Sequence, residues 1–455
     1  MVYREQKWVS LERVSVFGLG RVGLVMAVSL AKHGYRVAGI DVDPNILRKL
    51  AKGEASFYEP NLAEYLTLAL RTKRLTVTQD PSVNSRSDLA YVAVGTPSLK
   101  DGSMDVGRIE EVCRTIGRSL RDAGRHQLVI VKSTVLPGTA RNVVIPILES
   151  ESGKVAGKDF SVCSNPEFLR EGNAIHDTEH PDRIIIGSDD ASAIRKLENV
   201  YRTFHGRKLP PMIKTTFENA ELTKYANNAF LATKVSFINS IANIAERVPH
   251  ADVKSVAQGI GLDERIGPKF LNAGLGWGGS CLPKDLAALL NFSMGIKPDA
   301  GLIDAVVATN RRQGEKAAGL AREALGSLDG KQIAVLGLAF KPETDDMRDA
   351  VSIAVVNSLL TAGATVAVWD PRAMRQAQRM LGHRVRHATG AVNCLERADC
   401  CIIVTEWPEF KNLKPKTFLK KMRQPILIDG RRIYDPVEFR KEGIRLHAIG
   451  LGPED

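Results

Sequence analysis

A glycine-rich turn between two short apolar strands constrains the fold of this 455-residue chain more than any other feature. Residues 13–18 are predicted to form a strand that ends in Gly18, and a helical pattern follows as far as Ala31. A second strand is expected over residues 35–40, and Asp41 comes directly after it. Strand, glycine turn, helix, strand and acidic residue in this order are typical of a dinucleotide-binding βαβ unit.

The turn itself is expected to bind a pyrophosphate. Its residues are Gly18, Leu19, Gly20, Arg21, Val22 and Gly23. The first glycine permits the tight turn, the second lets the backbone approach the phosphates, and the third lets the helix pack on the strand. The helix N-terminus adds unpaired N–H groups and the positive end of its dipole. Asp41 would accept hydrogen bonds from the ribose hydroxyls and repel a 2′-phosphate, so NAD is expected rather than NADP. A glycine turn that binds nothing is the alternative.

Further apolar strands at residues 89–95 and 127–131 continue the α/β alternation. The loops that follow them contain Thr96 and Thr134, respectively. In a doubly wound sheet such loops lie at the carboxyl edge, where ligands bind. Both loops are therefore candidates for the binding site.

The middle of the chain differs in character. Residues 219–247 contain no Pro or Gly and carry apolar residues at helical spacing, so we expect one long helix that serves as a spine and an oligomerisation surface. Further helical segments run to about residue 313, interrupted by a glycine-rich loop at residues 274–280.

The last part repeats the βαβ pattern. An apolar strand is predicted at 332–338, a helix from about 350, a strand that ends before Asp370, and later strands at 400–405 and 425–429. We therefore predict an α/β chain with two Rossmann-like doubly wound domains joined by a central helical region. The expected domains are an NAD-binding domain at 1–213, a helical dimerisation domain with the glycine-rich loop at 214–315, and a second doubly wound domain at 316–455 that binds something other than the first cofactor.

Charge and hydropathy indicate which kinds of ligand the chain binds and where it is located. The net charge of +11 favours anionic partners, and because the charges are spread along the chain we expect a phosphate-bearing small molecule rather than nucleic acid or a membrane. The longest run without a charge, residues 350–369, contains polar residues and is predicted to be a helix, a glycine turn and a strand. The N-terminus lacks the apolar core of a signal peptide, so a cytoplasmic location is expected.

Cys281 is the candidate nucleophile among six cysteines. No CxxC or HExxH spacing occurs, so no metal site is expected. If a helix begins near Leu282, with Pro283 in its first turn, the thiol lies near the helix N-terminus, where the dipole and Lys284 favour the thiolate. A small buried apolar cysteine is the alternative.

Two further pairs carry candidate chemistry. Lys224 and Asn228 are four residues apart on the long helix and share a face, so the lysine could stabilise an oxyanion. Glu167 and Glu171 would face the same way in a helical turn, and one could act as a general base. A solvated helix face and an ordinary helix start are the respective alternatives.

These motifs occur in an order that resembles the UDP-glucose/GDP-mannose dehydrogenase family over essentially the whole chain. They are residues 18–23, 95–97, 132–134, 165–172, 221–228, 265–267, 278–285 and 337–348. The resemblance implies two NAD-dependent oxidations of the C6 alcohol of a nucleotide sugar to a carboxylate, through a thiohemiacetal and a thioester on Cys281. It also implies a homodimer or a higher homo-oligomer, with Arg265 reaching a neighbour's site.

The resemblance further implies that residues 214–315 carry the catalytic cysteine loop and that residues 316–455 bind the nucleotide sugar. It also implies roles for individual residues. Catalytic roles fall to Cys281, Lys224, Asp285, Asn228, Glu167 and Thr134. NAD contacts fall to the glycine turn and to Asp41, Thr96, Thr134, Glu171, Lys284 and Arg348. Substrate contacts fall to Glu167, Phe168, Leu169, Lys224, Asn228, Arg265, Phe270, Leu271, Asn272, Gly274, Lys341 and Arg431.

The sugar and the base remain open. UDP-glucose is expected, and Ser280 argues against N-acetylated sugars because their dehydrogenases usually carry His there. Residues 131–139 also resemble the GDP-mannose branch, so GDP-mannose or another UDP-sugar stays an alternative. A two-electron dehydrogenase would leave the Cys281 loop unexplained, and an inactive NAD-binding sensor would not be expected to retain Lys224 and Asp285.

Overall fold

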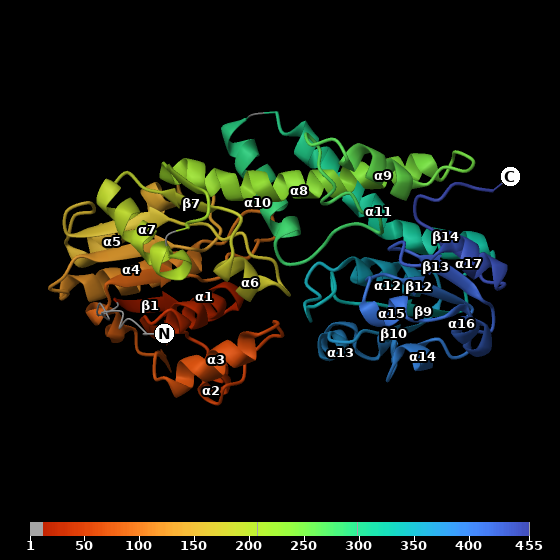
Figure 1. Cartoon of the computed structure of the whole chain (residues 1–455), viewed down its shortest axis with the longest axis horizontal. Coiled ribbons are helices and arrows are strands. Elements are labelled where there is room, and N and C mark those ends of the chain that lie inside the picture. The colour runs from red at the N-terminus through yellow and green to blue at the C-terminus, as the bar shows by residue number, and fades with distance from the viewer. Residues whose placement is uncertain (1–11, 207, 298, 455) are drawn as a thin grey trace, which may run out of the picture. The chain divides into compact units, whose positions relative to one another are not determined.

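The computed structural model describes residues 12–206, 208–297 and 299–454. The chain divides between Ala226 and Asn227 into two compact units, each built around a sheet of mostly or entirely parallel strands (Figure 1). Residues 1–11, on which the expectation about a signal peptide partly rests, lie outside the described residues.

The first unit contains an eight-stranded sheet in the order β3-β2-β1-β4-β5-β6-β7-β8. Its strands are β1 (Arg13–Phe17), β2 (Arg36–Ile40), β3 (Leu75–Thr78), β4 (Leu89–Val92), β5 (Gln127–Val131), β6 (Phe160–Ser164), β7 (Ile184–Gly187) and β8 (Met212–Thr215). All neighbouring strands are parallel except β6 and β7. The strand order reverses between β1 and β4, which is the topological switch point where ligands bind in such sheets.

Helices cover both faces of this sheet. They are α1 (Arg21–Lys32), α2 (Pro44–Ala51), α3 (Leu62–Arg71), α4 (Gly107–Arg121), α5 (Ile145–Ser152), α6 (Ala174–Glu179) and α7 (Ala191–His205), with short helical turns at Pro81–Arg86 and Ala140–Val144. Successive side chains of a strand point to opposite faces, so β5 sends Leu128 and Ile130 into the core under α1 and α3, and Val129 and Val131 into the core under α4 and α5.

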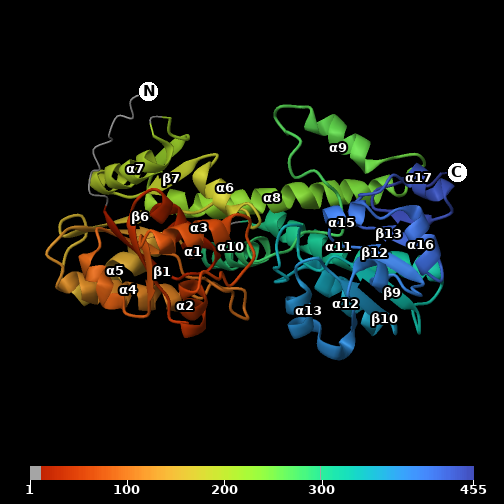
Figure 2. The same cartoon turned by 60° about the horizontal axis from the view of Figure 1, so that its bottom comes forward.

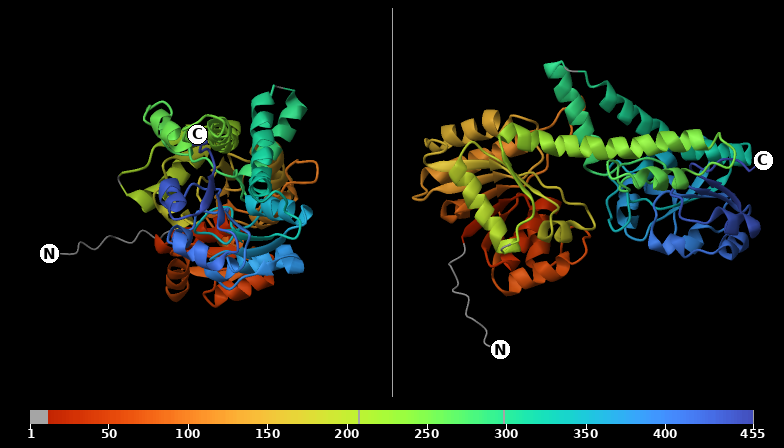
Figure 3. Two further views of the ribbon diagram at one scale, coloured as in Figure 1. Left: turned by 90° about the vertical axis from the view of Figure 1, so that its right-hand side faces the viewer. Right: turned by 45° about the horizontal axis from the view of Figure 1, so that its top comes forward.

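One long helix, α8 (Phe217–Ala245), starts in the first unit and continues in the second. Figure 3 shows it as a single unbroken rod. The sequence placed this helix within two residues of its observed ends, because no Pro or Gly interrupts its apolar spacing. It is followed by α9 (Val253–Gly261), α10 (Leu282–Ile296) and α11 (Gly301–Leu325), the last of which runs beyond the expected end near residue 313.

The second unit contains a six-stranded sheet in the order β11-β10-β9-β12-β13-β14, parallel throughout. Its strands are β9 (Gln332–Leu336), β10 (Thr365–Trp369), β11 (Arg386–His387), β12 (Cys400–Ile403), β13 (Ile426–Asp429) and β14 (Arg445–Ala448). Figure 2 shows helices packed around these strands. The helices of this part are α12 (Val351–Thr361), α13 (Met374–Leu381), α14 (Ala391–Cys394), α15 (Pro408–Lys411), α16 (Pro415–Lys421) and α17 (Pro436–Lys441), with a helical turn at Gly382–Arg384.

The predicted fold class is confirmed: the six strands of the second doubly wound sheet follow the same order as the first six strands of the first sheet, and a helical region separates the two sheets in sequence. The charge-free run at 350–369 is α12, a turn through Gly363 with φ +83°, and β10, as expected. Among the described residues, no helix combines the length and apolarity that crossing a membrane requires.

Candidate active site

The glycine turn of the first unit has the geometry that a dinucleotide requires. Gly18 has φ +89°, and a Cβ there would lie 2.9 Å from the Ala93 carbonyl oxygen. A Cβ on Gly23 would lie 1.8 Å from the Gly18 carbonyl oxygen, so only glycine permits this close packing of α1. Among the described residues, no atom lies within 4 Å of a Cβ on Gly20, and no side chain caps α1 there. The start of α1 thus offers backbone N–H groups and the positive end of its dipole to an anion, which fits the pyrophosphate of NAD.

Asp41 connects the end of β2 to this turn. Its Oδ2 accepts a hydrogen bond from the Leu19 N–H at 2.7 Å, and its Oδ1 accepts one from the Asp43 N–H at 3.0 Å. Each carboxylate oxygen keeps a further lone pair for a ribose hydroxyl. The side chain therefore fits the role that the sequence predicted for it.

The second sheet has an acidic residue at the matching place, Asp370 after β10, but its hydrogen-bonding capacity is taken up. Asp370 Oδ2 accepts from the N–H groups of Leu338 and Ala339 and from Trp407 Nε1, and Oδ1 accepts from the N–H groups of Arg372 and Ala373. With five donors and a buried side chain, it has little capacity left for a ribose. The dinucleotide chemistry of the first sheet is not repeated here.

The loops after β4 and β5 come together as predicted. Thr96 Oγ1 donates a hydrogen bond to the Thr134 carbonyl oxygen at 2.9 Å. Both loops follow parallel strands that are neighbours in the sheet, so their carboxyl ends lie at the same edge.

The expectation that Glu167 and Glu171 share a helical turn is wrong. Both lie in an irregular loop between β6 and α6. Glu167 Oε2 accepts a hydrogen bond from the Leu169 N–H at 2.7 Å, a local contact that competes with helical pairing. Glu171 instead lies 3.5 Å from Arg21 Nε of the glycine turn.

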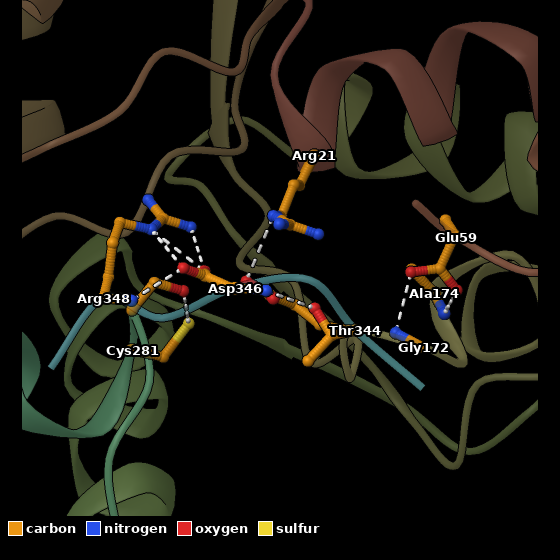
Figure 4. Close-up of polar contacts among 10 residues, drawn as sticks. Arg21, Glu59, Gly172, Ala174, Cys281, Thr344, Asp346 and Arg348 are labelled. Atoms are coloured by element: carbon orange, nitrogen blue, oxygen red, sulfur yellow. Dashed lines mark hydrogen bonds and ion pairs between the residues drawn. The ribbon is translucent and has the colours of Figure 1, made fainter. Parts of the chain in front are cut away.

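Glu59, which belongs to none of the sequence motifs, fixes the end of this loop. Its buried carboxylate accepts hydrogen bonds from the backbone N–H groups of Gly172 at 2.8 Å and Ala174 at 2.7 Å (Figure 4). These groups lie one and three residues after Glu171, so Glu59 restrains the position of the Glu171 backbone beside Arg21. No motif or spacing in the sequence pointed to this contact.

Glu167 forms a buried ion pair with Lys224 of α8. Lys224 Nζ lies 3.0 Å from Glu167 Oε1, and the two residues are 4% and 8% exposed. The ammonium also lies 5.4 Å from the centre of the Phe168 ring, whose π electrons attract a cation. The alternative of a solvated helix face is therefore wrong for Lys224.

One turn earlier on α8, Glu221 holds the loop that follows β5. Its carboxylate accepts hydrogen bonds from the N–H groups of Gly138 at 2.6 Å and Ala140 at 3.0 Å, and from Ser164 Oγ at 2.9 Å. Burial raises the pKa of this carboxyl to about 7. The start of α8 is thereby connected to the segment that carries Thr134.

Lys132 holds the start of the loop that carries Glu167. Its ammonium donates to Asn165 Oδ1 at 3.0 Å, and the Tyr201 hydroxyl donates to the same oxygen at 2.6 Å. All three side chains line a cavity in the first unit together with Glu167 and Phe168. Within the sequence alone, neither Lys132 nor Glu221 could be distinguished from other charged residues of their motifs.

In the second unit, Asn228 of α8 pairs with Asp285, as Lys224 of the same helix pairs with Glu167 in the first unit. Asn228 Nδ2 donates a hydrogen bond to Asp285 Oδ2 at 2.6 Å, and both side chains are buried. Lys284 pairs with Asp285 as well. Lys224 and Asn228 are thus four residues apart on α8 and each has a buried carboxylate partner, in the first and the second unit respectively.

Cys281 stands at the N-cap position of α10, as predicted from Pro283. Its carbonyl oxygen accepts the first helical hydrogen bond, from the Asp285 N–H at 2.9 Å. Cys281 is partly exposed, whereas the other five cysteines are buried. Cys281 is therefore not the buried apolar cysteine of the alternative interpretation.

The glycine-rich loop before Cys281 is packed closely on several sides. A Cβ on Gly278 would lie 2.2 Å from the Asp349 carbonyl oxygen, and one on Gly279, where φ is +91°, would lie 2.7 Å from the Phe340 ring. Arg431 Nη1 donates to the Gly276 carbonyl oxygen at 3.1 Å. The loop backbone thus fits against its surroundings only because these positions carry no side chain.

The remaining predicted contact residues lie at several places. Within the second unit, Phe270 is partly exposed with φ +65°, Leu271 is buried, and the Gly274 N–H is bonded to Asn239. Arg265 pairs with Asp263 at a well-exposed position. Arg348 binds Asp346 through two guanidinium nitrogens (Figure 4), and Lys341 Nζ lies 5.9 Å from the centre of the Phe340 ring.

Among the described residues, no three His, Cys, Asp or Glu side chains are grouped as a metal site.

Comparison with known proteins gives matches over nearly the whole chain. Residues 12–205, 218–312 and 334–436 match the NAD binding domain, the central domain and the UDP binding domain of the UDP-glucose/GDP-mannose dehydrogenase family. The chain is 43% identical to the UDP-glucose 6-dehydrogenase TuaD of Bacillus subtilis, over 97% of this chain and 93% of that protein. It is 40% identical to the UDP-glucose 6-dehydrogenase AglM of Haloferax volcanii, over 96% and 99%. A UDP-glucose dehydrogenase structure from Pyrobaculum islandicum superposes with a TM-score of 0.91 at 39% identity, covering 98% of this chain and 99% of that one.

Proposed function

The chain belongs to the UDP-glucose/GDP-mannose dehydrogenase family, and from that premise we propose that it oxidises UDP-glucose at C6 to the carboxylate, UDP-glucuronate. It is an NAD-dependent nucleotide-sugar dehydrogenase with NAD as its cofactor. A net oxidation by four electrons requires a group that can hold the intermediate aldehyde. The observation that supports the proposal most is Cys281, partly exposed at the N-terminus of α10, with the buried Asp285 one turn further on.

The glycine turn and Asp41 hold NAD, which when bound accepts two electrons and a proton as hydride in each of the two oxidations. In the first oxidation the C6 alcohol also loses its hydroxyl proton, which passes through a water held by Asn228 and Asp285 to the Asp285 carboxylate, and becomes an aldehyde. The Lys224 ammonium stabilises the negative charge that develops on the C6 oxygen. Its pairing with Glu167 restrains the ammonium before substrate arrives.

Cys281 then adds to the aldehyde. The thiolate forms a C–S bond, the oxygen takes a proton, and a thiohemiacetal results. Loss of that proton and of a hydride from C6 leaves a thioester. Water, with Glu167 as the proton acceptor, adds to the thioester carbon, the C–S bond breaks, and the products are the carboxylate and the free thiol.

We extend the proposal to the sites and domains. The residues up to about 213 bind NAD, with Thr96, Thr134, Glu171, Lys284 and Arg348 as further contacts. Residues 316–455 bind the nucleotide, and Arg265, Lys341, Arg431 and the segment 270–274 contact the nucleotide sugar. The match of residues 334–436 to a UDP binding domain supports UDP as the nucleotide.

A homodimer through α8 is also part of the proposal. Phe230, Phe237 and Ile244 follow one another at intervals of seven residues and are 66%, 51% and 60% exposed. Seven residues are close to two helical turns, so the three side chains form one apolar stripe. An exposed stripe of this kind is typical of a surface that a second copy of the chain covers.

A stoichiometric assay tests the reaction and the substrate together. Purified protein is mixed with NAD and, separately, with UDP-glucose, GDP-mannose or UDP-N-acetylglucosamine, and both NADH and sugar product are measured. Two NADH per uronic acid from UDP-glucose alone would support the proposal. Turnover of GDP-mannose instead would keep the reaction and change the substrate, whereas one NADH per turnover with an aldehyde product would contradict the thioester route.

A further inference from the structure

Two side-chain amides of α11 hold the glycine-rich loop at two separate points. Asn310 and Gln313 are three residues apart on the helix, and the backbone groups that they bind belong to Trp277 and Gly274, which are also three residues apart. None of the sequence motifs includes either amide. Both lie in the second unit, as does the whole loop.

Asn310 binds both backbone groups of Trp277. Its Oδ1 accepts a hydrogen bond from the Trp277 N–H at 2.8 Å, and its Nδ2 donates one to the Trp277 carbonyl oxygen at 2.8 Å. The indole is fixed as well, since Trp277 Nε1 donates to Ser236 Oγ at 2.9 Å and Trp277 belongs to a buried apolar cluster that includes Leu286 of α10. Trp277 is followed by three residues and then Cys281. Asn310 therefore restrains residues 277–281, the arm of the loop that carries the thiol.

Gln313 binds the other end. Its Nε2 donates to the Gly274 carbonyl oxygen at 2.7 Å, and the Gly274 N–H donates to Asn239 Oδ1 at 2.8 Å. Gln313 is itself oriented by Asn243, whose Nδ2 donates to Gln313 Oε1 at 3.1 Å. Gly274 is the last residue of the segment 270–274. Gln313 therefore restrains this segment, which is the other arm of the loop.

The two arms meet at Gly276, which has φ +111°. A buried backbone group left without a partner costs free energy, so each arm depends on the amide that pairs with it. Glycine is the least restrained residue type in the backbone, so the loop could change its conformation on one side of Gly276 while the other side stays in place. Arg431 binds the Gly276 carbonyl oxygen between the two arms, and each amide of α11 binds backbone groups on one side of it, so the two arms are held separately.

We propose that Asn310 and Gln313 are positioning residues with separate roles: Asn310 fixes the arm that presents Cys281, and Gln313 fixes the 270–274 arm that receives the nucleotide sugar. The second role rests on the proposed function, which assigns 270–274 to substrate binding. The first role rests on the geometry of the thiol arm alone.

The test compares Asn310→Ala, Gln313→Ala and the control Glu315→Ala, whose side chain is exposed on the same helix. The rate of Cys281 alkylation by iodoacetamide is measured across pH without substrate, and kcat and KM are measured for UDP-glucose. Asn310→Ala is expected to change the alkylation rate by about fivefold or more and to lower kcat, with KM for UDP-glucose within about twofold. Gln313→Ala is expected to raise KM by about fivefold or more with an alkylation rate within about twofold of wild type.

Milder variants guard against loss of the fold. Asn310→Asp keeps the acceptor for the Trp277 N–H but loses the donor to its carbonyl, and Gln313→Glu loses the donor to Gly274. The same division of effects is expected from this pair, and circular dichroism melts of all variants accompany the kinetics.

The outcomes separate this inference from the proposed function. If both Asn310→Ala and Gln313→Ala change alkylation and KM to the same extent, or if neither changes them, the separate roles are wrong. If the wild-type protein does not oxidise UDP-glucose, the proposed function fails. The alkylation comparison then still decides the role of Asn310: a changed rate in Asn310→Ala alone supports it, and equal rates overturn it.

Discussion

Lys224 Nζ lies 3.0 Å from Glu167 Oε1 in an ion pair that is almost closed to solvent. Removal of one partner from such a pair leaves the other charge buried without its counterion, which is costly. The pair therefore fixes the ammonium in one position, where the proposed reaction uses it to stabilise an oxyanion.

Replacement of Lys224 tests that role. In Lys224→Ala, kcat with UDP-glucose is expected to fall by about 10²- to 10³-fold, because a donor to the developing oxyanion is lost. UDP-glucose binding, measured by calorimetry, is expected to change much less. Lys254→Ala, an exposed lysine of α9, serves as the control. Near-normal turnover of Lys224→Ala would reject the oxyanion role.

Cys281 is expected to be the single thiol that iodoacetamide modifies in the native protein. The other five cysteines are buried, and burial raises the pKa of Cys113, Cys163 and Cys394 to about 12. Intact-mass spectrometry should therefore find one adduct in wild type and none in Cys281→Ala. The variant should form no uronic acid while it still binds NAD. Loss of NAD binding together with activity would instead indicate a structural role for the loop.

Asp41 is expected to set the preference for NAD over NADP. Asp41→Asn keeps an oxygen acceptor for the Leu19 N–H and removes only the negative charge. Repulsion of a 2′-phosphate is thereby relieved, so the ratio of kcat/KM for NAD to that for NADP should fall by about tenfold or more. Steady-state kinetics with both cofactors measure the ratio. An unchanged ratio would show that the charge of Asp41 does not discriminate.

Glu221 is expected to make stability depend on pH. Burial raises the pKa of its carboxyl from 4.5 to about 7 in the folded protein. Between these values the unfolded chain is ionised while the folded chain holds a proton, so the free energy of unfolding falls as pH rises from about 4.5 to 7. The loss at this site is about 3 kcal/mol. Urea titrations at several pH values in this range give the free energy of unfolding, which should fall more steeply with pH in wild type than in Glu221→Gln. Equal pH dependence in the two proteins would contradict the assignment.

The exposed stripe on α8 is expected to hold a dimer together. Phe237→Glu would bury a charge in the centre of the stripe that also contains Phe230 and Ile244, so light scattering should find the variant as a monomer. Val437→Glu, a substitution at another exposed apolar residue, is the matched control and should keep the wild-type mass. A wild-type monomer, or a Phe237→Glu dimer, would reject this interface.

Local pattern was enough to predict the elements. The glycine turn, the strand at 127–131 and the long helix were all placed within a few residues, because alternation of apolar residues and the positions of glycine depend on the nearest neighbours along the chain. The same reasoning placed Cys281 at the head of a helix, since Pro283 fits the first turn.

Local reasoning was wrong where a contact from elsewhere decides the conformation. The spacing of Glu167 and Glu171 fits a helical turn, yet each takes a partner outside its own loop, Lys224 and Arg21. A spacing of four residues predicts a shared face only if the segment is helical, and here the segment connects a strand to a helix at the ligand edge of the sheet.

The sequence by itself determined which residue types stand at the ends of which strands and helices, and hence the class of chemistry. Only the tertiary structure decided the pairs. Lys224 meets Glu167 and Asn228 meets Asp285 across 57 residues of chain in each case, and the two amides of α11 meet a loop more than 30 residues before them. Such pairings follow from the order in which strands and helices pack, and that order is set by burial of apolar surface over the whole unit rather than by the spacing of residues within any one segment.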